Sequence, residues 1–389
     1  MLTIGVLAIG ALASCRCGKS PPPAAARVPV PTPIARAAYV TNNGSDSISV
    51  IDRDGTTVTD VAIDVDPDAH EAPHHLAIDV ADGSLFVALA YPPEQAAAKK
   101  NDPHAAHGRG TTLGQLARLD LATLGVDETR EVDENPGDVV LTHDRKHVLV
   151  THFDMKRAMT AAAAGGHPST LFATLQVWDR ATLTKTSSRS LCVAPHGVIT
   201  TKDDRTAIVA CYGSDELAVV DLGSTSLATA RYPLGPAQGV LGAPKYGPYS
   251  ALLSPDEKRI VVADLEGADV RIFDVETKRF LAEQTLTLGS RVMMADFVSA
   301  DVVVAPLQSP DGLARLDVTH GAVLHRIAFT KAECELPHVV RKAKDGRVYV
   351  VCEGDHTSKG AVLEVDPETL ATKHRYVVGV YPDGIVFGD

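Results

Sequence analysis

The chain has 389 residues, few aromatic side chains and a formal net charge of -12 at pH 7. This charge argues against nucleic acid and anionic membrane surfaces as direct partners, because both would be repelled. The sequence contains no run of eighteen or more apolar residues, so it predicts no membrane-spanning helix. Its length, with many Gly, Pro and Val residues, is typical of one large all-β domain behind a short leader.

The first residues are predicted to be a targeting segment rather than part of the fold. An apolar stretch over residues 1–14 ends in Leu12-Ala13-Ser14 and is followed by Cys15, which resembles the lipobox of bacterial lipoproteins. The resemblance implies that Cys15 is lipidated and becomes the first residue of a protein anchored in the bacterial cell envelope, in the periplasm or at the outer membrane. The stretch carries no Lys or Arg at its start, which departs from the lipoprotein pattern. Residues 15–35 are rich in Pro and Ala and predict a semi-extended tether between the lipid and the domain.

From residue 36 onward, a degenerate unit of roughly fifty residues recurs seven times. Each copy alternates short strand-like runs with turns, and most copies contain a Pro followed by an apolar strand. A four-stranded sheet cannot bury its own faces, so such units must stack around an axis. The sequence therefore predicts a seven-bladed β-propeller of four-stranded antiparallel blades over residues 36–389.

The phase of the repeats predicts how the ring closes. The domain begins with a second strand at 37–41 and ends with a lone first strand at 383–387. We expect the C-terminal strand to complete the blade that the N-terminus starts, because this pairing removes the exposed sheet edges.

The first repeat carries a family resemblance. Tyr39-Val40-Thr41-Asn42, followed by the run Ser-Ile-Ser-Val-Ile-Asp at 47–52, is similar to the YVTN family of envelope β-propellers. The resemblance covers about residues 36–389 and implies kinship with lactonase-like propellers and with the haem d1 domains of nitrite reductases. It is specific for the fold and says little about activity.

Nine of the fifteen histidines are predicted to lie on one rim of the propeller. The residue after the Pro at the start of each innermost strand should face the mouth of the central channel, and Arg291 takes this place in the repeat that lacks the Pro. The candidate ligand-binding residues are His74, His75, His196, Tyr249, Arg291, His338 and Asp383.

Neutral imidazoles that converge with a carboxylate suit a transition metal such as Cu or Zn. The stronger metal candidates are His74, His196 and His338, and the weaker ones are His104, His107 and His152. The alternative is that each of these histidines caps a loop by hydrogen bonding and binds nothing.

The cysteines divide into two groups. Cys15 is assigned to the lipid and Cys17 is left over, whereas the other four form two equivalent pairs in two repeats. In an oxidising envelope compartment these pairs predict disulfides, with thiolates in a metal site as the alternative. The predicted bonds are Cys192–Cys211 and Cys334–Cys352.

Three functions are compatible with the sequence. The first is a lipid-anchored binding module whose rim holds a metal, a small ligand or an envelope protein partner. The second is a lactonase-like or lyase-like enzyme at the same channel mouth, in which Arg291 stabilises negative charge and Tyr249 donates a hydrogen bond. The third is a partner subunit of a haem or copper redox protein. The sequence shows no nucleophile elbow, phosphate loop or haem-attachment motif, and it leaves open whether the protein is an enzyme.

Overall fold

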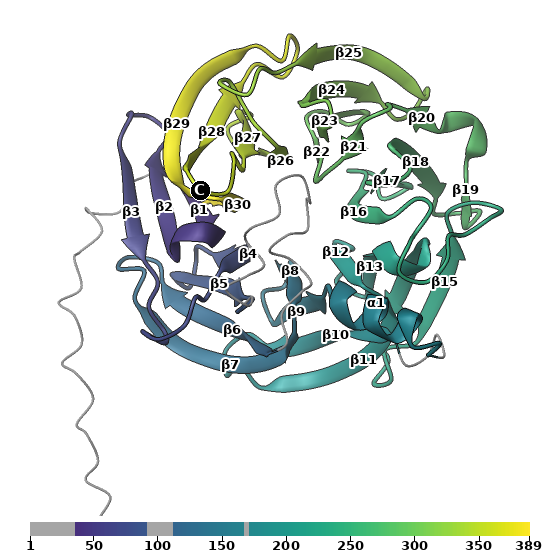
Figure 1. Cartoon of the computed structure of the whole chain (residues 1–389), viewed down its shortest axis with the longest axis horizontal. Coiled ribbons are helices and arrows are strands. Elements are labelled where there is room, and N and C mark those ends of the chain that lie inside the picture. The colour runs from purple at the N-terminus through teal and green to yellow at the C-terminus, as the bar shows by residue number, and fades with distance from the viewer. Residues whose placement is uncertain (1–35, 92–111, 167–170) are drawn as a thin grey trace, which may run out of the picture.

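The computed structural model describes residues 36–91, 112–166 and 171–389. These residues form seven antiparallel sheets arranged as a ring around a central axis (Figure 1). The predicted seven-bladed propeller is therefore confirmed. No helix among the described residues is long and apolar enough to cross a membrane.

The blades are numbered here in chain order and their strands are given from the axis outward. Blade 1 consists of β30 (Pro382–Phe387), β1 (Ala37–Asn42), β2 (Ser47–Asp52) and β3 (Val58–Ala62). Blade 2 consists of β4 (Pro73–Asp79), β5 (Ser84–Leu89), β6 (Leu113–Asp120) and β7 (Val126–Glu134). Blade 3 consists of β8 (Pro136–Leu141), β9 (His147–His152), β10 (Phe172–Asp179) and β11 (Lys185–Val193).

The remaining four blades follow the same plan with two variations. Blade 4 consists of β12 (Pro195–Thr200), β13 (Thr206–Cys211), β14 (Glu216–Asp221) and β15 (Thr229–Pro233). Blade 5 consists of β16 (Pro248–Leu253), β17 (Arg259–Asp264) and β18 (Asp269–Asp274), with β19 (Arg279–Phe280) and β20 (Leu286–Thr287) both paired to β18. Blade 6 has a split inner strand, β21 (Arg291–Val292) and β22 (Asp296–Phe297), followed by β23 (Val302–Gln308), β24 (Gly312–Asp317) and β25 (Ala322–Ala328). Blade 7 consists of β26 (Pro337–Lys342), β27 (Val348–Cys352), β28 (Lys359–Val365) and β29 (Thr372–Val380).

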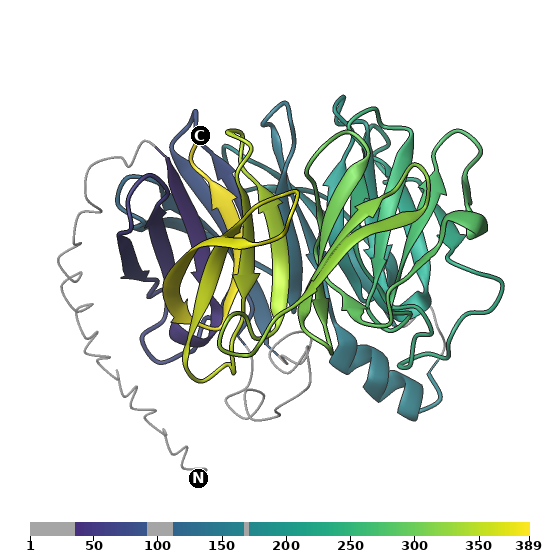
Figure 2. The same ribbon diagram turned by 90° about the horizontal axis from the view of Figure 1, so that it is seen from above.

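Short helices occur in the connections between strands. The helix α1 (Met155–Ala163) lies between the second and third strands of blade 3 and projects from one face of the ring (Figure 2). That connection marks the rim on which the histidines were predicted to gather. The single-turn helices among the described residues are η1 (Asn43–Ser45), η4 (Tyr212–Ser214) and η5 (Ala282–Gln284).

The ring is closed as predicted. Strand β30 pairs antiparallel with β1, with Tyr39 opposite Val386, so the two ends of the domain share blade 1. The side chain of Arg53 is fully buried beside this seam and forms ion pairs with Asp345 and Asp389. These contacts join blade 1 to blade 7 and to the last residue of the chain.

Six innermost strands share one local structure at their start. Each begins with a proline, and the residue before it has a φ between 49° and 58°. The carbonyl of that residue accepts a hydrogen bond from the backbone N–H just after the second strand, as Asn135 does from Phe153 at 2.7 Å and Leu336 from Glu353 at 3.1 Å. This left-handed conformation costs roughly 1–2 kcal/mol for a residue with a side chain, and the hydrogen bond offsets part of that cost. The repeated turn fixes the residue after each proline near the axis.

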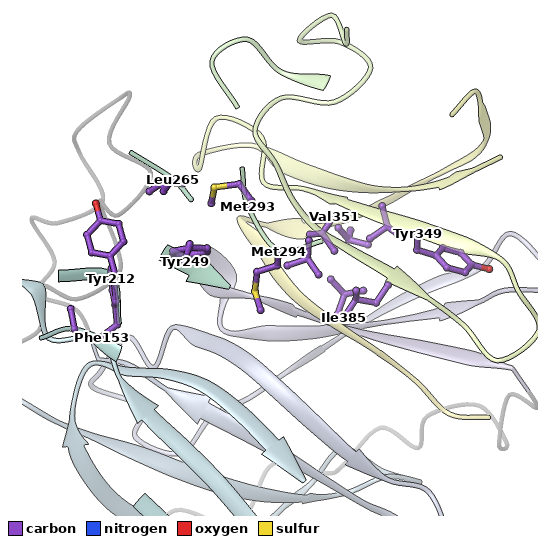
Figure 3. Packing of buried hydrophobic residues seen from close by; sticks show 14 of the residues in the cluster. Phe153, Tyr212, Tyr249, Leu265, Met293, Met294, Tyr349, Val351 and Ile385 are labelled. Carbon is purple, nitrogen blue, oxygen red and sulfur yellow. The ribbon is translucent and has the colours of Figure 1, made fainter. Parts of the chain in front are cut away.

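The core is built between blades and around the axis. One cluster of buried residues contains Tyr249, Met294 and Ile385, which come from three different blades (Figure 3). Full burial of an aliphatic or aromatic side chain of this size contributes about 1.5–3 kcal/mol. The axial cluster therefore gives a rigid frame to the side chains at the channel mouth.

Both predicted disulfides are present. Cys192 is bonded to Cys211 and Cys334 to Cys352, with sequence separations of 19 and 18 residues. Closing loops of this length stabilises a fold by roughly 3 kcal/mol each by the chain-entropy argument. Cys192, near the end of the outer strand β11, ties blade 3 to the end of the second strand of blade 4. Cys334 lies before the inner strand β26 and is bonded to the end of the second strand β27 within blade 7. The alternative, in which these thiolates bind metal, is wrong.

Candidate functional site

The residues after the prolines converge at the channel mouth. His74 on β4, His196 on β12, Tyr249 on β16, His338 on β26 and Asp383 on β30 each have at most 1% of their surface exposed. Five blades thus contribute polar side chains to one buried place on the axis. A polar group is buried at this depth only when it has partners, so their contacts define the site.

Two threonines on second strands hold neighbouring inner strands together. Thr151 donates to the carbonyl of His196 at 2.6 Å and accepts from the backbone N–H of Asp138 at 2.9 Å. Thr41 forms the equivalent bonds, donating to the carbonyl of His74 and accepting from the N–H of Gly384. The backbones that carry the histidines are therefore locked to adjacent blades.

Three histidines form a compact group, which we call the trihistidine cluster: His74, His75 and His196. Their ring centroids are 4.2 Å (His74 to His75), 5.4 Å (His75 to His196) and 5.9 Å (His74 to His196) apart. One potential ligand atom from each lies within 4.8 Å of the others. This spacing allows a single ion to contact all three rings after small side-chain rotations.

Each imidazole of the trihistidine cluster is oriented through its Nδ1 atom. The Nδ1–H of His74 donates to Asp383, that of His75 donates to Asp138 at 2.8 Å, and that of His196 donates to the carbonyl of Tyr249 at 3.1 Å. An acceptor at Nδ1 places the ring proton there and the lone pair on Nε2. Metal-binding histidines in proteins are held by the same kind of acceptor.

Burial decides the protonation of His74. It lowers the pKa of His74 below its usual value even though Asp383 opposes the shift. The imidazole is therefore neutral at pH 7, which is the form that binds metal. The Nε2 atom of His75 is also buried and makes no hydrogen bond within the described part of the chain.

A second group, the imidazolium cluster, lies next to the first and comprises His338, Asp383, Glu353, Tyr249 and His356. The Nδ1 atom of His338 is 2.9 Å from Asp383 and 3.0 Å from Glu353, and its Nε2 is 3.1 Å from the hydroxyl of Tyr249. His338 therefore forms ion pairs with both carboxylates. The other oxygen of Glu353 is 2.6 Å from Nε2 of His356.

The charges of the imidazolium cluster are set by mutual stabilisation. Burial by itself would lower the pKa of His338, but Glu353 and Asp383 raise it to about 10. Burial would raise the pKa of Glu353, yet His338 and His356 hold it below its usual value. His338 is therefore an imidazolium at pH 7 and Glu353 a carboxylate.

Two aromatic rings pack against the imidazole of His196. The ring of Tyr249 stacks on His196 with centroids 3.8 Å apart, and Phe153 meets His196 edge-on at 4.9 Å. Burial raises the pKa of Tyr249 well above its usual value, so its phenol remains protonated. Both contacts restrict rotation of the His196 ring.

The structure brings together six of the seven candidate ligand-binding residues and sets one apart. Arg291 is paired with Gln308, whereas the equivalent pairings in other blades are made by prolines, Pro248 with Asp264 and Pro337 with Cys352. Arg291 thus occupies the position of the proline, one residue before the position whose side chains face the channel mouth in the other blades. The physical reason is the split inner strand: after β21 the chain leaves its own sheet, and Met294 bonds to β26 of blade 7.

Of the weaker metal candidates only His152 lies among the described residues, and it belongs to neither cluster. His152 is buried at the end of β9 and its Nδ1 is 3.0 Å from the carbonyl of Thr174. Burial lowers its pKa to about 4, which indicates a neutral structural histidine. His104 and His107 lie outside the described residues, as does Cys15.

Sequence reasoning missed two carboxylates at the site. Asp138 is the second residue after Pro136, and its equivalent in blade 2 is His75. Glu353 directly follows β27, and the residues at this position in two other blades, Phe153 and Tyr212, also lie in the axial cluster. The repeat alignment contained both positions, so extending the ring by one residue, and adding the end of the second strand, would have found them.

Fold and site together define a β-propeller with a buried histidine–carboxylate centre at the mouth of its axial channel. No known protein family and no curated protein matches the sequence. Solved structures do match. A putative 6-phosphogluconolactonase from Bacteroides fragilis is 13% identical, with a TM-score of 0.63 over 92% of this chain and 100% of that one.

Two further structures extend the comparison. The periplasmic gluconolactonase of Pseudomonas aeruginosa is 16% identical, with a TM-score of 0.61 over 90% of this chain and 99% of that one. The hydrazine synthase of Kuenenia stuttgartiensis is 15% identical, with a TM-score of 0.59 over 83% and 91%. The chain therefore has the fold of the lactonase-like propellers. At these identities the likeness concerns the fold alone.

Proposed function

We propose that this protein is a metal-dependent hydrolase of the lactonase type, with a divalent transition-metal ion bound by the trihistidine cluster. One observation carries the proposal: His74, His75 and His196 all have their Nδ1 atoms on fixed acceptors, so that all three Nε2 atoms carry lone pairs. Three neutral imidazoles are a donor set that suits Zn²⁺ and Cu²⁺. The lactonases among the structures of the same fold support a ring-opening hydrolysis as the reaction class.

The charge balance of the site supports a divalent cation. Two buried carboxylates, Glu353 and Asp383, pair with the imidazolium of His338, and a third, Asp138, accepts from His75 and is only partly offset by Arg341. Buried negative charge in such excess is costly unless a cation offsets it. An ion at the trihistidine cluster would lie next to Asp138 and Asp383, which already accept from the ligand rings.

The residues of the site would serve hydrolysis in distinct ways. His74, His75 and His196 would hold a divalent ion, which would supply Lewis-acid activation of the water that attacks the substrate. Asp138 and Asp383 hold the ligand rings in place and keep their lone pairs on Nε2. The His338 imidazolium places a fixed positive charge beside the site, where it stabilises negative charge that develops on a substrate oxygen.

Metal analysis and an activity assay test this proposal together. Protein purified without chelator is expected to contain close to one equivalent of metal by mass spectrometry, and to hydrolyse at least one member of a panel of lactones that includes aldonolactones and lactones with an aliphatic chain ending in a carboxylate. Removing the metal with a chelator should abolish hydrolysis, and adding Zn²⁺ should restore it. Metal binding without any hydrolysis would leave only a metal-binding module, and the absence of bound metal would refute the site.

We also propose that the protein is lipid-anchored in the bacterial envelope. The lipobox at Cys15 and the two disulfides support this location, since structural disulfides persist in oxidising compartments. The variant Cys15→Ala is expected to move the protein from the membrane fraction to the soluble fraction after cell breakage. Unchanged membrane association of the variant would contradict the proposal, and Cys17→Ala is the matched control.

A further inference from the structure

An internal cavity connects the trihistidine cluster to the opposite end of the propeller. It has a volume of about 380 Å³ and begins at His75 and Asp138. From there it follows β4 through Leu76 and Ala77 to Ile78, a length of roughly 10 Å at the rise of a strand. Its size lies within the roughly 300–1,000 Å³ typical of small-molecule sites.

A second cavity continues the first toward solvent. It has a volume of about 480 Å³ and shares Ile78, Leu141, Arg341, Ile385 and Val386 with the first. Its lining continues to Val80 and Ala81, which lie in the turn beyond the end of β4. The two cavities therefore form one channel that opens on the rim opposite α1.

Most of the channel wall is aliphatic, but its outer end is basic. Side chains of Val139, Val198, Ala251, Met294 and Ile385 line the inner part. The cations of the outer part are Arg145, Arg341, Lys342 and Lys344. A site of this build favours a ligand with an apolar body and a negatively charged end.

The carboxylates of the channel are already paired with other groups. At the outer end, Asp79 is bonded to Arg145 and Arg180, and Asp389 to Arg53. Within the described part of the chain, no carboxylate lies within salt-bridge distance of Arg341, Lys342 or Lys344. In a chain with a net charge of -12, three such cations at one opening create a local potential that attracts anions.

Deeper in the channel, two more carboxylates are hydrogen-bonded to backbone groups, and Arg341 interacts with both of them electrostatically without a direct salt bridge. Asp138 accepts from the N–H of Val198 at 3.0 Å as well as from His75, and Asp296 accepts from the N–H groups of Phe297 and Lys342. The guanidinium of Arg341 donates through Nη1 to the carbonyl of Val340 at 2.9 Å, which holds it at the junction of the two cavities. Its fork is the group best placed to bind a carboxylate, because a guanidinium matches that geometry.

We infer that the substrate is a small amphipathic carboxylate that enters from this opposite rim. Its aliphatic part lies in the channel, its carboxylate is bound by Arg341, and its reacting end reaches His75 and Asp138. The inference rests on the proposed function, and it places substrate entry on the rim opposite the one on which the ligand-binding residues were predicted to lie.

Calorimetric titration with hexanoate as the probe tests the inference on the full-length metal-loaded protein. Wild type is expected to bind hexanoate, and Arg341→Gln is expected to bind it at least about 10-fold more weakly, the effect of losing one charge-assisted hydrogen bond. Lys331→Gln, an exposed cation elsewhere on the surface, should bind like wild type. Hexanol and inorganic phosphate should both bind more weakly than hexanoate, because each lacks one half of the recognised structure.

Three outcomes would overturn the inference: no hexanoate binding, equal binding by wild type and Arg341→Gln, or equal binding of hexanoate and either control compound. The channel itself is tested by Ala251→Phe, which fills the inner cavity and should abolish hexanoate binding. Zn²⁺ affinity measured on the same samples shows whether each variant has kept its fold. It also separates the two proposals, because protein that binds hexanoate but no metal would refute the metal site and retain the channel.

Discussion

His75→Ala is expected to weaken Zn²⁺ and Cu²⁺ binding by on the order of 100-fold or more. Loss of a residue that merely orients a ligand costs roughly 10–100-fold in metal affinity, and loss of the ligand itself should exceed this. The fold should survive, because Asp138 keeps the backbone donors of Val139 and Val198 after the imidazole is removed. Competition titration against a chelator of known affinity measures the change.

Variants of the other histidines serve as comparisons and controls in this experiment. His196→Ala should have a similar effect, whereas His320→Ala, whose side chain is 78% exposed, should bind metal like wild type. His338 was also predicted to be a ligand, and with His75 and Asp383 it forms the alternative group of potential ligands. If metal binding survives His74→Ala and His196→Ala but not His338→Ala, the ion sits in that alternative group and the trihistidine proposal fails.

The pH dependence of metal binding follows from the protonation of the ligands. Free imidazole side chains take up protons near pH 6.5, and protons compete with the ion. Burial lowers the pKa of His74, so this ligand stays neutral, and competent, to a lower pH than an exposed histidine would. Affinity is therefore expected to be constant above neutral pH and to fall only in acid.

The features that repeat from blade to blade could be predicted from the sequence, and those that occur in one blade only could not. Seven copies of one strand pattern determine the blades, the ring closure and the position that follows each proline. The repeat alignment also contains the positions of Asp138 and Glu353, but each carboxylate occurs in a single blade, and only the three-dimensional ring shows what it contacts. The disulfides were predictable because two blades repeat them.

Arg291 shows how the repeat argument fails. Its blade lacks the proline that anchors the alignment, and its inner strand is split between β21 and β22. The predicted alignment of this blade was therefore wrong by one position. The residue whose backbone N–H donates to the carbonyl of His338 is Met294 and not Arg291. The axial channel was equally invisible in the sequence, since its cavity depends on the sizes of side chains from several blades.

His338→Leu is expected to destabilise the metal-free protein by about 3–5 kcal/mol, the range for removing one partner of a buried ion pair. The variant leaves Asp383 and Glu353 buried without the imidazolium that balances them. Urea unfolding at pH 7, with both disulfides intact and chelator present, measures the loss. A loss below about 1 kcal/mol would indicate that water or another cation already compensates these carboxylates.

The double variant His338→Leu, Glu353→Gln separates charge from packing. Removing one of the two uncompensated charges should recover part of the stability, whereas a loss caused by poor packing of leucine would not be recovered. Glu353→Gln alone serves as the reference, since it leaves His338 paired with Asp383.

The pH dependence of the stability difference between wild type and His338→Leu gives an independent check that His338 is positively charged. The pKa of His338 is raised to about 10 in the folded protein from about 6.5 in the unfolded chain. A raised pKa means that the folded state binds the proton more tightly, so the stabilisation is fully present below pH 6.5 and is lost as pH rises through 10. The stability difference between wild type and His338→Leu should therefore shrink steadily between pH 7 and pH 10. A difference that stays constant over this range would mean that His338 is neutral in the folded protein, and the fixed positive charge assigned to it beside the trihistidine cluster would then be wrong.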